Sequence, residues 1–111
     1  MMRAPILAGT LLAAEVQVDD GRSLPVRDII LDRQAPRALG IEVQDRSRSM
    51  FVPWLALSIT SDRVSALGST LQPAEHYAFY LEAGRRVGQK ATSSALRRVT
   101  IDPDGALSRF Q

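Results

Sequence analysis

The fold is decided by residues 16–67, which read VQVDDGRSLPVRDIILDRQAPRALGIEVQDRSRSMFVPWLALSITSDRVSAL. Here short runs of alternating polar and apolar residues are separated by Gly, Pro or polar breaks. A period of two is typical of half-buried β-strands, because successive side chains point to opposite faces of a sheet. Five or six such strands predict a mainly β fold, a small barrel that closes to remove its exposed edges.

The first of these runs ends in a turn signal. Val16 and Val18 alternate with polar residues and are expected to face the core, and Asp20-Gly21 follows them. Gly tolerates the positive φ that hairpin turns require, so the dipeptide predicts a hairpin. In the next strand, over 26–32, strict alternation places Asp28 on the same face as Val26 and places the odd-numbered residues on the opposite face.

Two prolines divide the remaining strands. Pro36 stands where a new strand begins, and the run that follows it places Leu39, Ile41 and Val43 on one face. Pro53 is expected at a strand end or edge, where its missing N–H costs little. A last short strand covers 63–67.

The period changes after residue 72. Apolar residues then fall at i, i+3, i+4 and i+7, namely Ala74, Tyr77, Ala78 and Leu81. With Pro73 in the first turn and Gly84 after the last one, this spacing predicts a short amphipathic helix over 73–83. Its apolar face is expected to cap one end of the barrel.

The order of four short motifs is similar to that of a known family. The motifs are Asp20-Gly21, Val26-x-Asp28 with Leu31-Asp32, the strand from Leu39 to Val43, and Val52-Pro53-Trp54. Together they resemble the PRC-barrel family, although Pro25 stands where that family usually has Gly. The family includes the cytoplasmic domain of the photosynthetic reaction-centre H subunit and the C-terminal domain of a ribosome-maturation factor.

The resemblance implies a barrel core over about 6–67, built by Leu31, Ile41, Val52 and Trp54. It also implies a bacterial protein-binding or assembly module, with no family-wide catalytic residues to carry over. Fold analogy alone does not fix function.

The last quarter of the chain partly repeats the start. Residues 84–88 (GRRVG) parallel 21–25 (GRSLP), and residues 96–102 (LRRVTID) parallel 26–32 (VRDIILD). This partial repeat, over 84–111, ends before any counterpart of Val52-Pro53-Trp54. Half a barrel cannot bury its own apolar face, so Val99, Ile101, Leu107 and Phe110 must lie against the first barrel or against another molecule.

Two-fold self-association is the economical solution, since a self-complementary surface closes into a dimer. The predicted partner surface consists of Arg85, Arg86, Arg97, Arg98, Val99 and Ile101. On this hypothesis Ile101→Asp weakens self-association and spares the fold.

The composition fits one globular domain over 1–111, too short for two independent cores. The chain has no cysteine, which excludes disulfides, thiolate metal sites and a cysteine nucleophile. The apolar N-terminal run is interrupted by Pro5 and Gly9 and is too short to span a bilayer. We therefore expect a cytoplasmic chain whose first residues form a strand or lead into one.

The residues that carry chemistry are sparse. His76 is the single histidine, and a metal site would need carboxylates or a second subunit beside it. Asp28 and Asp32 could form an acid/base pair, but strand-end Asp residues more often bond turn amides. Asp102-Pro103-Asp104-Gly105 lacks the later ligands of a calcium loop and predicts a β-turn. We expect no catalytic, metal or cofactor site, and no enzyme.

One feature supports an alternative function. Residues 1–82 carry eight Arg against ten carboxylates, whereas residues 83–111 carry five Arg and one Lys against two Asp. Such a basic strip could bind RNA phosphates or anionic lipid. Only Phe110 lies in it, whereas single-strand binders interleave aromatic rings with the charges. An RNA- or ribosome-associated module is therefore the alternative to a protein-binding module, and an enzyme would require a concave apolar pocket with converging polar groups.

Overall fold

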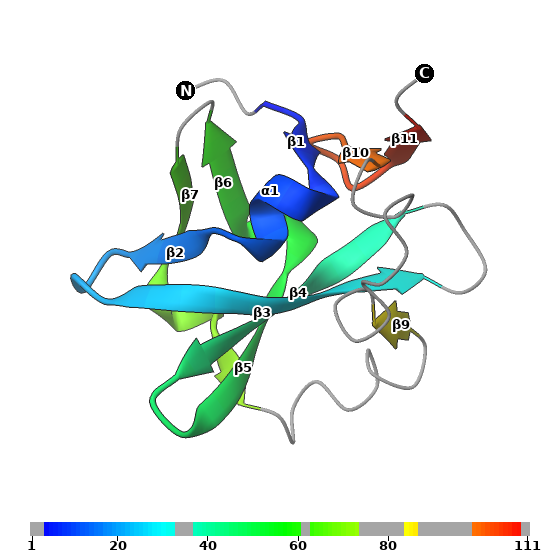
Figure 1. Cartoon of the computed structure of the whole chain (residues 1–111). Helices are drawn as coiled ribbons and strands as arrows, with labels where there is room; N and C mark the ends of the chain where they lie inside the picture. Colours follow the sequence, from blue (N-terminus) through cyan, green and yellow to red (C-terminus); the bar gives the residue numbers. More distant parts are fainter. Residues whose placement is uncertain (1–3, 33–36, 61–62, 74–83, 87–98, 110–111) are drawn as a thin grey trace.

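The computed structural model describes residues 4–32, 37–60, 63–73, 84–86 and 99–109, and it is mainly β, as predicted (Figure 1). The strands are β1 (Ile6–Leu7), β2 (Glu15–Val18), β3 (Ser23–Asp32), β4 (Ala38–Asp45), β5 (Arg48–Pro53), β6 (Leu57–Thr60), β7 (Arg63–Ala66), β8 (Gln72–Pro73), β9 (Gly84–Arg86), β10 (Val99–Ile101) and β11 (Leu107–Arg109). Helix α1 covers Ala8–Leu12, and two 3-10 turns, η1 and η2, cover Trp54–Ala56 and Gly68–Thr70.

The strands form two sheets that are not closed into a barrel. The larger sheet has the order β6-β7-β2-β3-β4-β5-β8, with β9 paired to β3, and the smaller one has the order β1-β10-β11. The predicted closed barrel is therefore corrected to an open arrangement. The physical reason lies in the core, where α1 and β10 supply apolar side chains that further strands of a closed sheet would otherwise supply.

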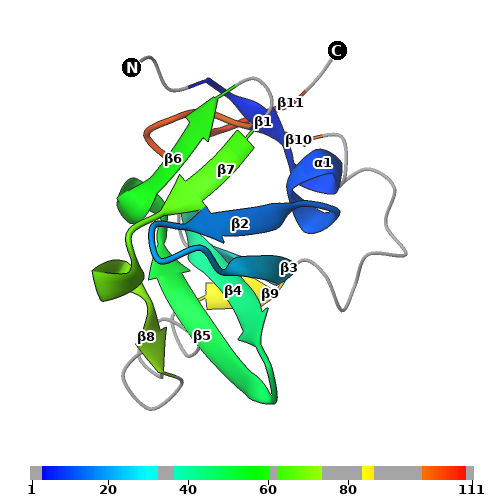
Figure 2. The ribbon, with the colours of Figure 1, turned by 90° about the vertical axis from the view of Figure 1, so that its left-hand side faces the viewer.

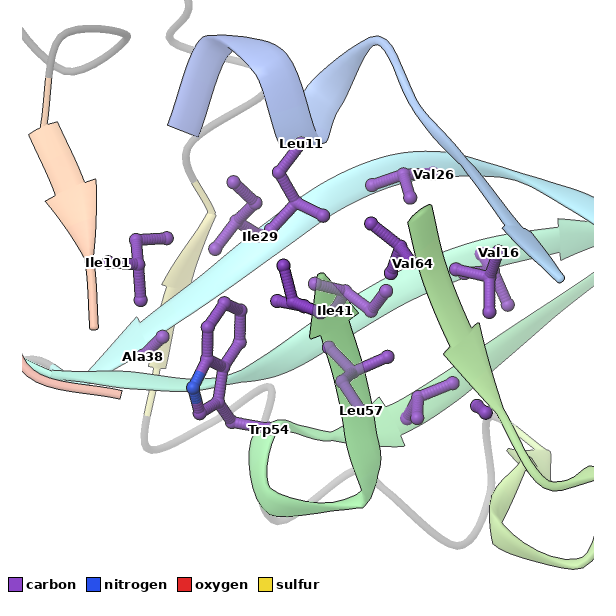
Figure 3. Close-up of a cluster of buried hydrophobic side chains, with 14 of the residues drawn as sticks. Leu11, Val16, Val26, Ile29, Ala38, Ile41, Trp54, Leu57, Val64 and Ile101 are labelled. Atoms are coloured by element: carbon purple, nitrogen blue, oxygen red, sulfur yellow. The ribbon is translucent and has the colours of Figure 1, made fainter. Parts of the chain in front are cut away.

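The main core joins these parts. Leu11 of α1, Ile29 of β3 and Ile101 of β10 are buried in one cluster with Trp54 (Figure 3). Leu31, Ile41 and Val52 belong to the same cluster, so the four residues expected to build the core do so. Helix α1 contacts both β3 and β10, which places it between the two sheets.

The N-terminal segment differs from the prediction. A strand or strand-leading segment was expected there, and the structure has the two-residue β1 followed by the five-residue α1. Ala8 and Leu11, three positions apart, point into the core. The helix has no side-chain cap and no acidic residue in its first turn, so the signals that announce a helix in a sequence are missing.

The predicted Asp20-Gly21 hairpin is confirmed. Strands β2 and β3 pair antiparallel around it, Gly21 has φ 96°, and Val16 and Val18 are buried. The Val18 amide donates to the Arg22 carbonyl (2.9 Å), and the Gly21 amide donates to the Val18 carbonyl (2.9 Å). These bonds define a three-residue hairpin loop whose last position requires a left-handed backbone.

A second turn repeats this pattern at residues 102–106. The Asp102 amide donates to the Ala106 carbonyl (2.8 Å), the Gly105 amide donates to the Asp102 carbonyl (2.8 Å), and Gly105 has φ 93°. In both turns the Asp before the Gly accepts from the amide two residues later, at 3.0 Å: Asp20 from Arg22, and Asp104 from Ala106. The β-turn predicted at 102–105 is therefore confirmed, and it joins β10 to β11.

Strands β3 and β4 contain two bulges that strict alternation does not predict. Val26 pairs with Val43 and Asp28 with Glu42, so Arg27 is an extra residue in β3. Farther along, Ile30 pairs with Gly40 and Leu31 with Ala38, so Leu39 is an extra residue in β4. Each bulge exchanges the two faces of its strand.

The bulges correct two predicted faces. Val26 lies in the main core together with Ile29, whereas Asp28 has the opposite parity from Ile29. Likewise Leu39 does not lie on the same face as Ile41. It packs in a second, smaller cluster with Ile30 and Phe51. Gly40 allows this packing, because a Cβ there would lie 2.4 Å from both Phe51 Cζ and the Val52 carbonyl oxygen.

The later predicted elements are described only in part. Strand β5 ends at Pro53, as predicted. Of the helix expected over 73–83, Pro73 lies in β8 and the remaining residues fall outside the described ranges. In the expected repeat, Gly84–Arg86 form strand β9, whereas their supposed counterparts Gly21 to Ser23 form a turn and the start of β3. The described residues of the first matching pair thus differ in secondary structure. In the second matching pair, residues 99–101 form a strand, as residues 29–31 do.

Candidate functional site

The residues predicted as a partner surface are not gathered on one described surface. Arg97 and Arg98 lie outside the described residues. Arg85 and Arg86 belong to β9, whose backbone pairs with β3 at Leu31 and Ile30. The other two, Val99 and Ile101, belong to β10 in the smaller sheet.

Ile101 requires a correction. Its side chain is 1% exposed within the single chain, and its strand pairs with β1 through Ile6. Val99 is half-buried in the same strand. The C-terminal apolar residues were expected to lie either against the rest of the chain or against another molecule. Ile101 lies against the core of its own chain. Because Ile101 is buried in the core of its own chain, we expect Ile101→Asp to destabilise the fold and not to spare it.

Trp54 attaches the hairpin of β10 and β11 to the larger sheet. Its indole Nε1 donates to the carbonyl oxygens of Asp102 and Pro103, both at 3.2 Å. On the same turn the Ala38 amide donates to the Gly105 carbonyl at 2.7 Å. Trp54 is thus a structural residue, and its buried ring is not a binding surface.

Two carboxylates are buried in the larger sheet. Asp28 and Glu42 are directly opposed on β3 and β4, at 2% and 6% exposure. Asp28 Oδ1 accepts from the Ile29 amide at 2.8 Å, which is the kind of backbone bond expected for an Asp at a sheet irregularity. Asp32, the other half of the imagined acid/base pair, is half-buried at the end of β3.

These carboxylates do not form a metal centre with their described neighbours. Within the described ranges, no three or more His, Asp or Glu residues lie together as a group that could hold a metal ion. The same ranges contain no helix long and apolar enough to cross a membrane.

A more open candidate is the outer face of β6, β7 and β2, which lie side by side in Figure 2. β7 pairs with β6 antiparallel and with β2 parallel. The register aligns Ser65 of β7 with Ser58 on one side and with Gln17 on the other. Gln17 also donates through Nε2 to the Ser23 hydroxyl at 2.9 Å. A row of small polar side chains therefore crosses the face.

Two adjoining hollows lie on this face. The first, of about 620 Å³, extends from β2 and β7 to Ile6 and Ala14. The second, of about 600 Å³, extends over the same strands to Ala56 and Leu67. Gln17, Thr60 and Arg63 line both hollows, which therefore adjoin, and we call the pair the β2–β7–β6 groove.

Arg63 is the only cationic residue lining the described groove. Its side chain is exposed and makes no ion pair or hydrogen bond with the described residues. Glu15, in line with Arg63 on β2, lines the first hollow, and Asp19 lines the second. Asp19 is engaged, because its Oδ1 accepts from the Gly68 amide at 2.8 Å.

No family model matches the chain, and no curated protein matches it.

A third hollow, of about 350 Å³, lies at the tips of the hairpins and is lined by Arg22, Asp45 and residues 46–48. Arg22 donates through Nε to Asp20 Oδ2 (2.8 Å) and through Nη1 to Asp45 Oδ2 (2.6 Å). The backbone amide of Arg22, followed by its side chain, lowers the pKa of the Asp20 carboxyl below its usual value. Two carboxylates thus already neutralise the positive charge of Arg22. This disfavours anion binding in the hollow, although arginines line it.

The groove is not evident from the sequence alone. Alternation did predict that Gln17 and Asp19 point away from the core. The parallel pairing of β2 with β7 leaves no local sequence signal, because the two strands are separated by β3 to β6. A useful signal was available in Arg63, Ser65 and Leu67, whose parity places them on one face of the strand.

Proposed function

We propose that this chain is a non-catalytic protein-binding module of the PRC-barrel type that acts in the bacterial cytoplasm. The observation that supports this proposal is the β2–β7–β6 groove, which no described residue covers and which joins polar side chains to exposed apolar ones. Leu67, at the far end of the groove, is 57% exposed. Apolar anchors surrounded by polar groups are typical of surfaces that bind other proteins.

The same groove argues against the alternatives. Its described lining contains one Arg and two carboxylates and no aromatic residue, whereas RNA binders combine several cations with stacking rings. It also contains no histidine, and neither of its carboxylates forms a hydrogen bond with a hydroxyl group of the described lining. The basic strip around Arg97 and Arg98 stays a prediction for an RNA-associated role.

A photo-crosslinking residue placed at Ser58 in living cells tests the proposal. Ser58 is exposed and lines the groove, so we expect a discrete covalent adduct with a protein. The matched control carries the same residue at Ser47, in the tip of the β4–β5 hairpin, and should give no such adduct. An adduct with RNA, or the same adducts from both positions, would contradict the proposal.

Self-association is part of the prediction and has its own test. Light scattering over a concentration series at two salt levels measures the mass of the purified chain. A concentration-independent dimer would support the expected homodimer. A monomer at all concentrations would restrict the module to partners other than itself.

A further inference from the structure

We propose that the β2–β7–β6 groove binds an extended peptide segment of another protein through an acidic side chain and an apolar side chain four residues away. The inference rests on the proposed protein-binding function and names the chemistry of the partner. Three features of the groove carry it: the position of Arg63, the position of Leu67, and the concave shape between them.

Arg63 determines the charge of the occupant. Arg63 lines both hollows, and its guanidinium forms no ion pair with a described residue. A guanidinium forms strong charge-assisted hydrogen bonds with a carboxylate, and its planar fork favours two at once. Glu15, in line with Arg63 on the neighbouring strand, makes no ion pair with it. The position over Arg63 therefore favours an Asp or Glu side chain.

Leu67 determines the second contact. Arg63, Ser65 and Leu67 have the same parity, and all three line the second hollow. Four residues of extended chain span about 13 Å at 3.3 Å per residue. A peptide that runs along β7 with its acidic residue over Arg63 thus brings its fourth neighbour to Leu67 and Ala56. An apolar residue there removes exposed Leu67 surface from water.

The middle of the groove suits a peptide backbone. Gln17, Ser58 and Ser65 are small or flexible hydrogen-bonding side chains between the two contacts. They can bond to peptide N–H and C=O groups without selecting side chains.

The concave shape disfavours a second copy of this chain face to face. Two hollowed faces of the same shape leave a void between them, and a stable interface requires close complementarity. A single extended segment fills a groove that another sheet face cannot. Because Glu15 is in line with Arg63 and Asp19 lies at the Leu67 end of the groove, the segment should carry one carboxylate over Arg63 and no acidic run.

Selection from a displayed random heptapeptide library on the full-length chain tests the proposal. We expect enrichment of sequences with Asp or Glu at one position and an apolar residue four positions away. Arg63→Glu should exchange the acidic preference for Lys or Arg. Arg48→Glu makes the same charge change at an exposed site outside the groove and should leave the selection unchanged.

A selected peptide then allows a quantitative check by fluorescence anisotropy. Arg63→Gln should weaken binding by about tenfold, the value of one charge-assisted hydrogen bond. Glu15→Gln should strengthen it, because it removes a like charge beside the peptide carboxylate. Circular dichroism melts of each variant show whether the fold is retained.

The outcomes separate this inference from the broader function. No enrichment, or an acidic preference that Arg63→Glu leaves unchanged, would overturn the proposed groove chemistry. If Ser58 nevertheless crosslinks to a protein, the protein-binding function stands and the groove chemistry alone fails. The face would instead be assigned to a second copy of the chain if Glu15→Gln and Arg63→Gln each weakened dimer formation and if exchanging the two charges restored the dimer.

Discussion

The two Asp-Gly turns of this chain have the same hydrogen bonds and different surroundings. At residues 18–22 and 102–106 the same three bonds close the loop, with glycine at φ 96° and 93°. A Cβ at Gly21 would meet nothing within 4 Å, whereas one at Gly105 would lie 3.0 Å from the Ala38 carbonyl oxygen. One turn is therefore a solvent-exposed connection, and the other is a packing contact against Ala38 and Trp54.

The comparison shows that local sequence specifies the shape of a turn and not its role. Asp-Gly predicts the left-handed residue in both places, because only glycine adopts that backbone without strain. Whether the turn then meets water or protein depends on residues distant in the chain, such as Trp54, whose indole bonds to two carbonyls of the second turn.

The largest expected effect concerns the residue just before each turn. Ile101→Asp places a charge in the main core and should lower the free energy of unfolding by about 4 kcal/mol. Gln17→Asp, at the equivalent position of the first turn, is exposed and should change it by less than about 0.5 kcal/mol. Urea unfolding monitored by Trp54 fluorescence measures both. A well-folded Ile101→Asp variant would contradict the packing of β10 in the core.

The two glycines provide a closer comparison. Gly21→Ala should cost about 1 kcal/mol, because only the left-handed backbone opposes the new methyl group. Gly105→Ala carries the same backbone cost and also crowds Ala38 and Trp54, so we expect about 2 to 3 kcal/mol. Thermal melts of the two variants under identical conditions test the difference. Equal losses of stability would mean that the second turn is not packed as described.

The smallest effect is a pH dependence at the first turn. Bonding by the Arg22 amide lowers the pKa of the Asp20 carboxyl below its usual 3.8. A carboxyl whose pKa is lower in the folded state stabilises the fold above its unfolded pKa, and this contribution is lost as the pH falls through the folded pKa. Asp20→Asn should therefore remove part of the decline in stability below about pH 4. Parallel acid titrations of the two proteins would settle this, and identical curves would argue against it.

The sequence predicted the strands better than their arrangement. Alternation identified Val16 and Val18 as core residues, and Leu31, Ile41, Val52 and Trp54 are buried as expected. It could not predict the faces of Asp28 and Leu39, because a bulge depends on the pairing of two strands and not on the pattern of either one. The open sheets follow from the packing of α1 and β10 into the core, which is a long-range property.

The candidate site was predicted least well. The partial repeat predicted that Ile101 lacks a partner within the chain, whereas β1 supplies that partner. Arg63 received no role, since the shared parity of Arg63, Ser65 and Leu67 indicates one face of a strand and does not indicate a groove until the neighbouring strands are known. The groove exists only through the parallel pairing of β2 with β7.

The two bulges of the β3–β4 hairpin lie on opposite strands, Arg27 in one and Leu39 in the other, so each cancels the offset of the other. The hairpin has the same alignment at Val26–Val43 and at Leu31–Ala38, and only the segment between them is displaced by one residue. Because Arg27 and Leu39 are the unpaired residues of their bulges, deleting either one would leave every described pair of β3 and β4, and the face of each paired side chain, as it is, and would convert that bulge into regular pairing. In the terms of insertions and deletions, these are the two positions at which one strand of the hairpin can lose a residue without changing its pairing.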